Sequence, residues 1–289
     1  MRVFITGAGG YVGGVVAARL VTAGHTVVGL ARSDESARRI RRLGAEARLG
    51  SLGDVQLLRD SARQADAVVH TAVDYLDPAF AACENTALDA LLDAGGGGPL
   101  VYTSSTLVLS DTGSEPVGED GDASVETLQP FKRSGEDRVL RAGGTVVRLG
   151  LVYGRNGSSL LATLLSAARE HGVSSYVGSG EARWSTVHVD DVADLFVRVV
   201  RAGVSAGGVV HAVEAQAVTW REIAEAIGRN VGVPAVALTL EQAAAAFGPM
   251  AVQLTRSLWV TPTRPGEFFG WSPAGKGVIH DLEHGSYRN

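Results

Sequence analysis

A glycine-rich turn near the start of the chain constrains the fold more than any other feature. It reads Thr6-Gly7-Ala8-Gly9-Gly10-Tyr11-Val12-Gly13 in a chain of 289 residues. Four β-prone residues at 2–5 come before it, and an apolar-rich stretch as far as residue 21 comes after it. A strand, a glycine turn and a helix in this order can hold a dinucleotide, because the free N–H groups and the positive dipole end of the helix face the phosphates.

The glycines of this turn have separate roles. Gly7 permits the tight turn off the strand, and Gly9 and Gly10 let the backbone approach a pyrophosphate. Gly13 lets the helix pack close to the strand. The alternative is a glycine turn that holds no ligand. A second predicted strand at residues 25–31 closes a βαβ unit, and this context favours the dinucleotide site.

Strand and helix patterns alternate along the first half of the chain, which predicts an α/β fold of the Rossmann type with a doubly wound parallel sheet. The last part is aromatic and poorly periodic, which suits a smaller C-terminal substrate-binding domain over the carboxyl edge of the sheet. Strands are predicted at 2–5, 25–31, 45–49, 66–72, 100–105, 145–149 and 208–213, and helices at 78–94, 130–141, 160–169, 187–201 and 220–230. The predicted dinucleotide-binding domain comprises 1–150 with 187–213 returning to it, and the smaller domain comprises 151–186 and 214–289.

Composition and charge argue against several classes of function. Hydrophobic residues make up 45% of the chain and charged residues 20%, as in ordinary folded domains. The net charge of −5 argues against a nucleic-acid partner. Cys83 is the single cysteine, so we expect no intramolecular disulfide and no metal site. The single cysteine also favours a cytoplasmic protein. Residues 2–5 lead straight into the glycine turn, so we expect no signal peptide, and no apolar run reaches about eighteen residues, so we expect no membrane span.

Six further segments give the chain a family resemblance. They read GSLGD at 50–54, VVHTA at 68–72, YTSS at 102–105, VVRLGLVYG at 146–154, VHVDDVADLF at 187–196 and GSY at 285–287. Together with the glycine turn they make the chain resemble the short-chain dehydrogenase/reductase superfamily in its extended, epimerase/dehydratase-like form. The resemblance implies a nicotinamide dinucleotide cofactor and chemistry at a carbonyl or alcohol carbon.

The resemblance breaks at the expected active site. Family members carry a tyrosine, and a lysine four residues later, on the helix predicted here at 130–141. Aligning Ser134 with the family's serine places Phe131 at the tyrosine and Gly135 at the lysine, and no Tyr-x-x-x-Lys occurs in the chain. The chain therefore resembles the atypical subgroup of the extended type. Lys132 points about 100° away from Phe131 on a helix and is predicted to lie on the surface.

Arg32 and Ser33 follow the second predicted strand, where an acidic residue would bind the adenosine ribose. A guanidinium and a hydroxyl instead favour a 2′-phosphate, so we predict NADP rather than NAD. The alternative is a solvated arginine that opens a helix, with Asp34 as the helix cap.

The resemblance implies further cofactor contacts. Ser51 stands where relatives often place an aspartate that reads the adenine, and Leu52 is expected to pack against the ring. His70 is expected to pack in its strand rather than act as a base. The full predicted cofactor set is Gly7, Gly9, Gly10, Tyr11, Val12, Gly13, Arg32, Ser33, Ser51, Leu52, His70, Thr71, Ala72, Thr103, Leu149 and Val152.

Two residues are candidates for catalysis. Ser105 matches the family's serine or threonine that hydrogen-bonds the reacting oxygen, and the alternative is a strand-end serine that bonds the backbone. Tyr75, after the strand at 66–72, is a candidate replacement acid, and the alternative is an exposed loop tyrosine.

Three residues further along the chain are expected mainly to support structure. Tyr153 is expected to pack near the nicotinamide end, and Asp190 to cap the helix at 187–201. Trp184 either helps the neighbouring arginine clamp a substrate or fills the core between the domains.

These observations predict an NAD(P)(H)-dependent oxidoreductase that acts on a carbonyl or alcohol of a small sugar-like or polyketide-like molecule. One alternative is a redox-neutral epimerase or dehydratase that recycles bound cofactor. Another is an NADP-binding sensor or partner protein without turnover, which the residues at 131 and 135 keep open. The resemblance also implies a possible homodimer, because the helices after the fourth and fifth strands often pair between subunits in relatives.

Overall fold

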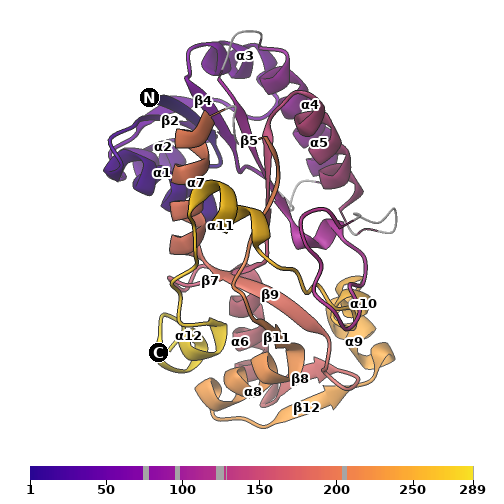
Figure 1. The fold of residues 1–289 in the computed structure, drawn as a ribbon. Helices are drawn as coiled ribbons and strands as arrows, with labels where there is room; N and C mark the ends of the chain where they lie inside the picture. The colour runs from indigo at the N-terminus through magenta and orange to yellow at the C-terminus, as the bar shows by residue number, and fades with distance from the viewer. Residues whose placement is uncertain (74–77, 95–97, 122–126, 128, 204–206, 289) are drawn as a thin grey trace.

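The computed structural model describes all residues except 74–77, 95–97, 122–126, 128, 204–206 and 289. Two parts follow each other from the top to the bottom of Figure 1, a larger one around a parallel sheet and a smaller one below it. The amino terminus lies in the first part and the carboxyl terminus in the second.

The described residues of the larger part form a seven-stranded sheet in the order β10-β6-β5-β4-β1-β2-β3. Every neighbouring pair in it is parallel. The strands are β1 (Arg2–Thr6), β2 (Thr26–Ala31), β3 (Glu46–Leu49), β4 (Ala67–His70), β5 (Leu100–Ser105), β6 (Thr145–Leu149) and β10 (Gly208–Ala212). This arrangement confirms the predicted Rossmann-type α/β fold.

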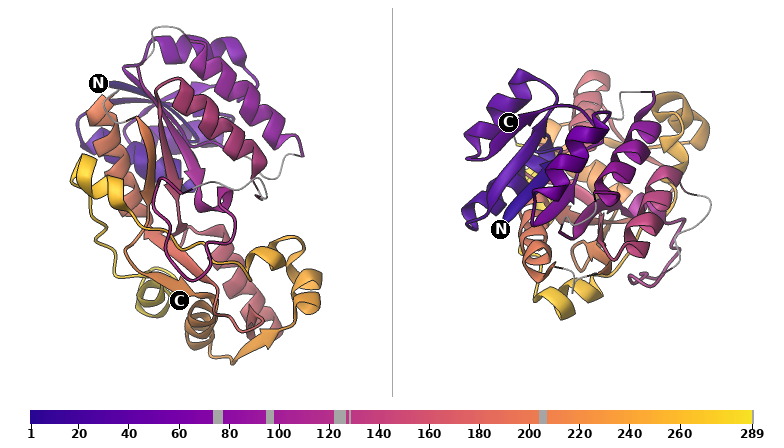
Figure 2. Two further views of the ribbon diagram at one scale, coloured as in Figure 1. Left: turned by 45° about the vertical axis from the view of Figure 1, so that its right-hand side comes forward. Right: turned by 90° about the horizontal axis from the view of Figure 1, so that it is seen from above.

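Helices cover both faces of this sheet (Figures 1 and 2). One face packs against α1 (Tyr11–Thr22), α2 (Asp34–Arg42) and α7 (Val189–Ala202), and the other against α3 (Val55–Arg63), α4 (Phe80–Leu92) and α5 (Pro130–Arg141). Side chains alternate between the two cores because successive strand residues point to opposite faces. Val3 and Ile5 of β1 face the first core, and Phe4 faces the second.

The smaller part is built from short strands and helices around a third core. It contains a three-stranded sheet in the order β11-β9-β7 and a two-stranded sheet of β12 and β8. Its elements are β7 (Leu151–Tyr153), α6 (Ser159–His171), β8 (Ser174–Val177), β9 (Arg183–His188), β11 (Ala217–Thr219), α8 (Trp220–Val231), β12 (Ala235–Leu238), α9 (Leu240–Phe247), α10 (Met250–Gln253) and α12 (Val278–His284). Helix α11 (Thr263–Phe269) instead contacts α7 and β10 of the larger part.

The path of the chain between the parts differs in one detail from the prediction. The helix expected at 187–201 begins at Val189, because Val187 and His188 belong to β9 and pair with β7. The chain then returns through α7 to β10, which pairs with β6 in the large sheet. None of the helices in the described residues is long and apolar enough to cross a membrane.

Candidate cofactor and substrate site

The glycine turn is closed by contacts that leave no room for side chains. Gly7 has a φ of 78°, and the backbone N–H of Gly10 donates to the Gly7 carbonyl at 2.9 Å. A Cβ on Gly13 would lie 2.2 Å from the Gly7 oxygen and 2.4 Å from the Thr71 hydroxyl. Helix α1 therefore starts directly against the ends of β1 and β4, with its first N–H groups at the turn.

Tyr11, the first residue of α1, connects this turn to the smaller part. Its hydroxyl donates to the Gly154 carbonyl at 2.6 Å. The Tyr287 hydroxyl accepts from the backbone N–H groups of Gly154 at 3.3 Å and Ser158 at 3.2 Å. Burial, together with the neighbouring Tyr287, raises the pKa of Tyr11, so its phenol keeps its proton at neutral pH. Val12 is half-buried against the first core.

The end of β2 carries the residues expected to choose between the two dinucleotides. Arg32 is exposed at this end. The hydroxyl of Ser33 accepts from the Ser36 N–H at 3.2 Å and caps α2, so Ser33 and not Asp34 is the helix cap. Ser36 was not predicted to belong to the site, although a Cβ on Gly9 would meet its hydroxyl oxygen at 2.3 Å. The turn and the start of α2 are thus in contact.

Ser51 and Leu52 follow β3. The backbone N–H and hydroxyl of Ser51 both donate to one carboxylate oxygen of Asp54, at 2.6 and 3.0 Å. These two bonds lower the pKa of Asp54. Leu52 is half-buried and packs against the second core. The position predicted to read adenine therefore carries a serine that is oriented by Asp54.

The end of β4 supports the turn from below. The fully buried ring of His70 bonds the Thr6 hydroxyl at 2.6 Å and stacks on Tyr102 with centroids 5.8 Å apart. Burial lowers the pKa of His70 to about 3, so the ring is neutral. The Thr71 hydroxyl donates to the Thr6 carbonyl at 2.7 Å, and Ala72 follows. As expected, His70 is a packed strand residue rather than an available base.

At the end of β5, the hydroxyl of Ser105 is held between two groups. It donates to the Gln129 side-chain oxygen at 2.8 Å and accepts from the Leu107 N–H at 3.2 Å. Sequence reasoning missed Gln129, which is buried and lies just before Pro130 at the start of α5. A polar residue before a helix-opening proline was the available indication. Tyr75, the other candidate catalytic residue, lies outside the described residues.

The two positions aligned with the family's tyrosine and lysine are filled in a different way. Phe131 is buried, with its ring edge-to-face to Phe80 at 5.1 Å between centroids. Gly135 lies under Tyr102, and a Cβ there would come within 2.5 Å of the Tyr102 hydroxyl oxygen. A larger side chain at position 135 would collide with Tyr102.

The surface position predicted for Lys132 is wrong. Its side chain is 6% exposed, and its ammonium donates to Glu84 at 2.5 Å and to the Thr103 carbonyl at 3.0 Å. The Tyr102 hydroxyl donates to the same Glu84 oxygen at 2.6 Å, and the ammonium lies 4.6 Å from the centre of the Tyr102 ring. Burial lowers the pKa of Lys132, and the charge of Glu84 opposes this effect. Lys132 therefore ties α5 to α4 and β5 from inside.

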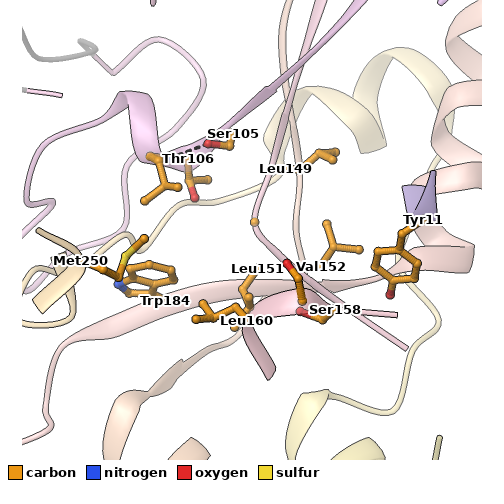
Figure 3. Close-up of a pocket in the computed structure, with 13 residues that line it drawn as sticks. Tyr11, Ser105, Thr106, Leu149, Leu151, Val152, Ser158, Leu160, Trp184 and Met250 are labelled. Carbon is orange, nitrogen blue, oxygen red and sulfur yellow. Dashed lines mark hydrogen bonds between the residues drawn. The ribbon is translucent and has the colours of Figure 1, made fainter. Parts of the chain in front are cut away.

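A cavity of about 230 Å³ opens where the two parts meet (Figure 3). Ser105 lies along one side of it, Tyr11 at one end, and Trp184 with Met250 at the other end. Thirteen residues line it: Tyr11, Ser105, Thr106, Leu107, Leu149, Gly150, Leu151, Val152, Ser158, Ser159, Leu160, Trp184 and Met250. Of the predicted residues, the cavity brings together Tyr11, Ser105, Leu149 and Val152. Thr103 is half-buried on β5, two residues before Ser105.

Residues around β9 hold this cavity in shape. The Trp184 ring is buried edge-to-face against Trp220, and its N–H donates to the Arg256 carbonyl at 2.9 Å. Tyr153 is packed as expected, and its hydroxyl donates to Glu214 at 2.5 Å.

The predicted cap of the helix at 187–201 is wrong. His188 caps α7, and its ring nitrogen accepts from the Asp190 N–H. Asp190 lies in the first turn of α7, and its carboxylate forms an ion pair with Arg155 at 2.7 Å. The residue directly before the helix therefore caps it, and the acidic residues of the first turn do not.

Comparisons with known proteins show which sequences and folds this chain is similar to. A protein of Saccharomyces cerevisiae, the uncharacterized protein YLL056C, is 33% identical over 98% of both chains. A 4-hydroxy-2-methyl-3-oxo-4-farnesyl-3,4-dihydroquinoline-1-oxide ketoreductase from Stigmatella aurantiaca is 28% identical over 67% of this chain and 63% of its own. The solved dTDP-glucose 4,6-dehydratase from Bacillus anthracis, in complex with NAD, superposes with a TM-score of 0.81 over 99% of this chain and 96% of its own, at 16% identity.

The family assignment rests on most of the chain. The model of the NAD dependent epimerase/dehydratase family matches residues 3–212, from β1 to the end of β10. With the glycine turn, the parallel sheet and the cavity beside Ser105, this match shows that the chain belongs to the NAD dependent epimerase/dehydratase family, the extended form of the short-chain dehydrogenase/reductase superfamily.

Proposed function

We propose that this protein is an NADP(H)-dependent oxidoreductase that interconverts a carbonyl and an alcohol on a small molecule. The observation that carries the proposal is the shared cavity. Tyr11, at the dinucleotide turn, and Ser105, at the end of β5, line the same space. A substrate oxygen near Ser105 would thus lie beside a cofactor that starts from the glycine turn.

The residues at the turn fit a dinucleotide. Cβ atoms on Gly7 and Gly13 would meet backbone atoms within 3 Å, so the backbone segments pack too closely there for any side chain. This leaves the first N–H groups of α1 at the surface of the turn, where a pyrophosphate can accept their hydrogen bonds. A bound nicotinamide dinucleotide supplies or accepts the hydride.

Ser105 is the residue of this chain that would act on the substrate oxygen. Its hydroxyl can turn from Gln129 to donate to a carbonyl oxygen, while the Leu107 N–H keeps the serine oxygen in place. Gln129 is a positioning residue, because it holds the hydroxyl at the cavity before substrate enters. Neither group releases a proton at neutral pH, so we propose that the proton comes from water, from a hydroxyl of the substrate or from Tyr75.

The activity is tested by mixing the protein with NADPH and a panel of ketones and keto sugars, and by following cofactor absorbance and product together. Oxidised cofactor with a matching alcohol product supports the proposal. Ser105→Ala should lower kcat by about a hundredfold, while Thr22→Ala, whose hydroxyl bonds only the Ala18 carbonyl on an exposed face, should not change it.

Two other functions would give different results. A redox-neutral epimerase or dehydratase, as the family description includes, would alter the substrate while the net amount of NADPH stays constant. The packed Phe131 and Gly135 favour a third function, a cofactor-binding sensor, which would bind NADPH without converting any member of the panel. Either result would contradict net oxidoreduction.

We further propose that the cofactor is NADP rather than NAD. Arg32 and the hydroxyl of Ser33 lie at the end of β2, and a guanidinium with a hydroxyl suits a 2′-phosphate. Arg32→Ala should weaken NADPH binding by roughly tenfold to a hundredfold, the equivalent of one charge-assisted bond, and leave NADH binding nearly unchanged. Calorimetry with both cofactors measures this, with Arg38→Ala on the exposed face of α2 as the matched control. Tighter binding of NADH by the unmodified protein would contradict the proposal.

A further inference from the structure

We infer that the cavity selects a neutral, predominantly apolar ketone, with Met250 and Trp184 as the residues that recognise its apolar end. This inference rests on the proposed oxidoreductase function and names the substrate class of the same site. It separates the protein from enzymes whose substrates are nucleotide sugars, because those substrates carry a diphosphate that needs cationic partners.

The lining contains hydroxyl groups but no charged side chain. Among its thirteen residues, all in the described part of the chain, none is Lys, Arg, His, Asp or Glu. Figure 3 shows Ser105 and Thr106 on one side of the cavity, Ser158 between Leu160 and Tyr11, and Trp184 with Met250 at the end opposite Tyr11. A ligand with one polar oxygen near Ser105 and an apolar body toward Met250 fits this arrangement.

Two arginines lie close to lining residues in the sequence, and each contacts another side chain. Arg155, on the loop after β7, pairs with Asp190 at 2.7 Å. Arg183 lies 5.5 Å from the centre of the Trp259 ring. A diphosphate entering the cavity would lose its hydration shell among Leu107, Leu151 and Leu160 without a cation to replace it, and such desolvation is strongly unfavourable.

The size and stiffness of the cavity agree with a small apolar ligand. Its volume of about 230 Å³, which the substrate would share with the cofactor beside Tyr11, is below the roughly 300–1,000 Å³ of sites for drug-sized ligands. Trp184 is fixed by its hydrogen bond to the Arg256 carbonyl and by Trp220. Met250 is half-exposed on the short helix α10 and has an unbranched, adaptable side chain. One wall is therefore rigid, and the other can adjust to ligands of different length.

The first experiment compares two ligand classes on the full chain loaded with NADPH. Cofactor binding is measured first by calorimetry, and its absence would contradict the proposed function itself. With NADPH bound, a series of methyl ketones from 2-butanone to 2-nonanone is compared with dTDP-glucose and UDP-glucose. We expect KM for the ketones to fall by about threefold to fourfold per added methylene until the cavity is full. We expect no saturable binding of either nucleotide sugar.

The second experiment tests whether Met250 contacts the apolar end of the ligand. Met250→Ala should raise KM for 2-nonanone by about tenfold and leave KM for 2-butanone within about twofold, since the short ketone does not reach the end wall. Val252→Ala is the matched control, because this residue lies on the same helix, is 40% exposed and does not line the cavity. Circular dichroism confirms that both variants are folded.

Three results would overturn the inference while leaving the oxidoreductase proposal intact. The first is saturable binding of dTDP-glucose or UDP-glucose by the NADPH-bound protein. The second is a KM that is independent of ketone length. The third is an equal effect of Met250→Ala on the short and the long ketone.

Discussion

The glycine turn and the start of helix α5 serve the same edge of the large sheet, yet different contacts hold them. At the turn, backbone meets backbone: the Gly7 oxygen occupies the space where a Gly13 side chain would begin. At α5, complementary side chains pack together: Tyr102 fills the space beside Gly135, and Lys132 points inward to Glu84. The first region depends on the absence of side chains and the second on a matched set of them.

This difference explains why the glycine turn could be predicted from the sequence and the contacts of α5 could not. Glycine is the only residue compatible with contacts as short as those at Gly13, so a dinucleotide turn leaves a fixed signature. A buried polar network can be assembled from several combinations of residues, because only the sum of its charges and hydrogen bonds must balance. The helix that carries the family's tyrosine and lysine is therefore free to change its residues while keeping its place.

The largest effect is expected where the second region is broken. Lys132→Met removes one partner of the buried pair and leaves Glu84 with an uncompensated charge. We expect a loss of about 3–5 kcal/mol in the free energy of unfolding, measured by urea denaturation. Since Lys276 is exposed near the carboxyl terminus, Lys276→Met is the control and should stay within about 0.5 kcal/mol of the unmodified protein.

A second substitution then separates charge from packing. Glu84→Gln combined with Lys132→Met keeps an acceptor for the Tyr102 hydroxyl and removes both charges. We expect this double variant to recover most of the lost stability, because the pair contributes mainly by mutual compensation. A double variant as unstable as the single one would show that the lost hydrogen bond to the Thr103 carbonyl, and not the unpaired charge of Glu84, accounts for the loss.

The next effect tests the first region. Gly13→Ala places a Cβ 2.2 Å from the Gly7 carbonyl oxygen, so the turn or the helix must shift. We expect a loss of about 2–3 kcal/mol in stability and of about a hundredfold in NADPH affinity. Gly14→Ala, one residue further along α1, meets its nearest atom at 3.4 Å and should be neutral or stabilising by up to about 1 kcal/mol. Equal behaviour of the two variants would show that the turn is not tightly closed.

Much of the large sheet could be predicted from local patterns. Helix α5 and strand β6 were predicted with the bounds that the structure has, because Pro130 opens the helix and a β-branched run follows it. The short strands of the smaller part were missed. β8 and β12 have four residues each and pair across about sixty residues of sequence, so neither carries a period that indicates its partner.

The error at Lys132 has a physical cause. Its direction on the helix does differ from that of Phe131, but both directions face protein. The buried positions of α5 are Phe131, Lys132, Gly135, Glu136 and Val139, a wide face that includes two charged residues. Glu136 is satisfied there by Arg148 of β6, with two bonds of 2.9 and 2.8 Å. Hydropathy assigns charges to the solvent side, and their partners on other elements are invisible in a local pattern.

The smallest effect is expected in the pH profile of kcat, which tests whether a titrating side chain supplies the proton. Tyr11 is the one ionisable residue among those described as lining the cavity, and burial raises its pKa, so it stays protonated. With both substrates saturating, kcat should vary by less than about twofold between about pH 6.5 and pH 9. A tenfold fall per pH unit within this range would reveal a titrating proton donor. If Tyr75→Phe then flattened the profile, Tyr75 would be the acid that replaces the tyrosine missing at position 131.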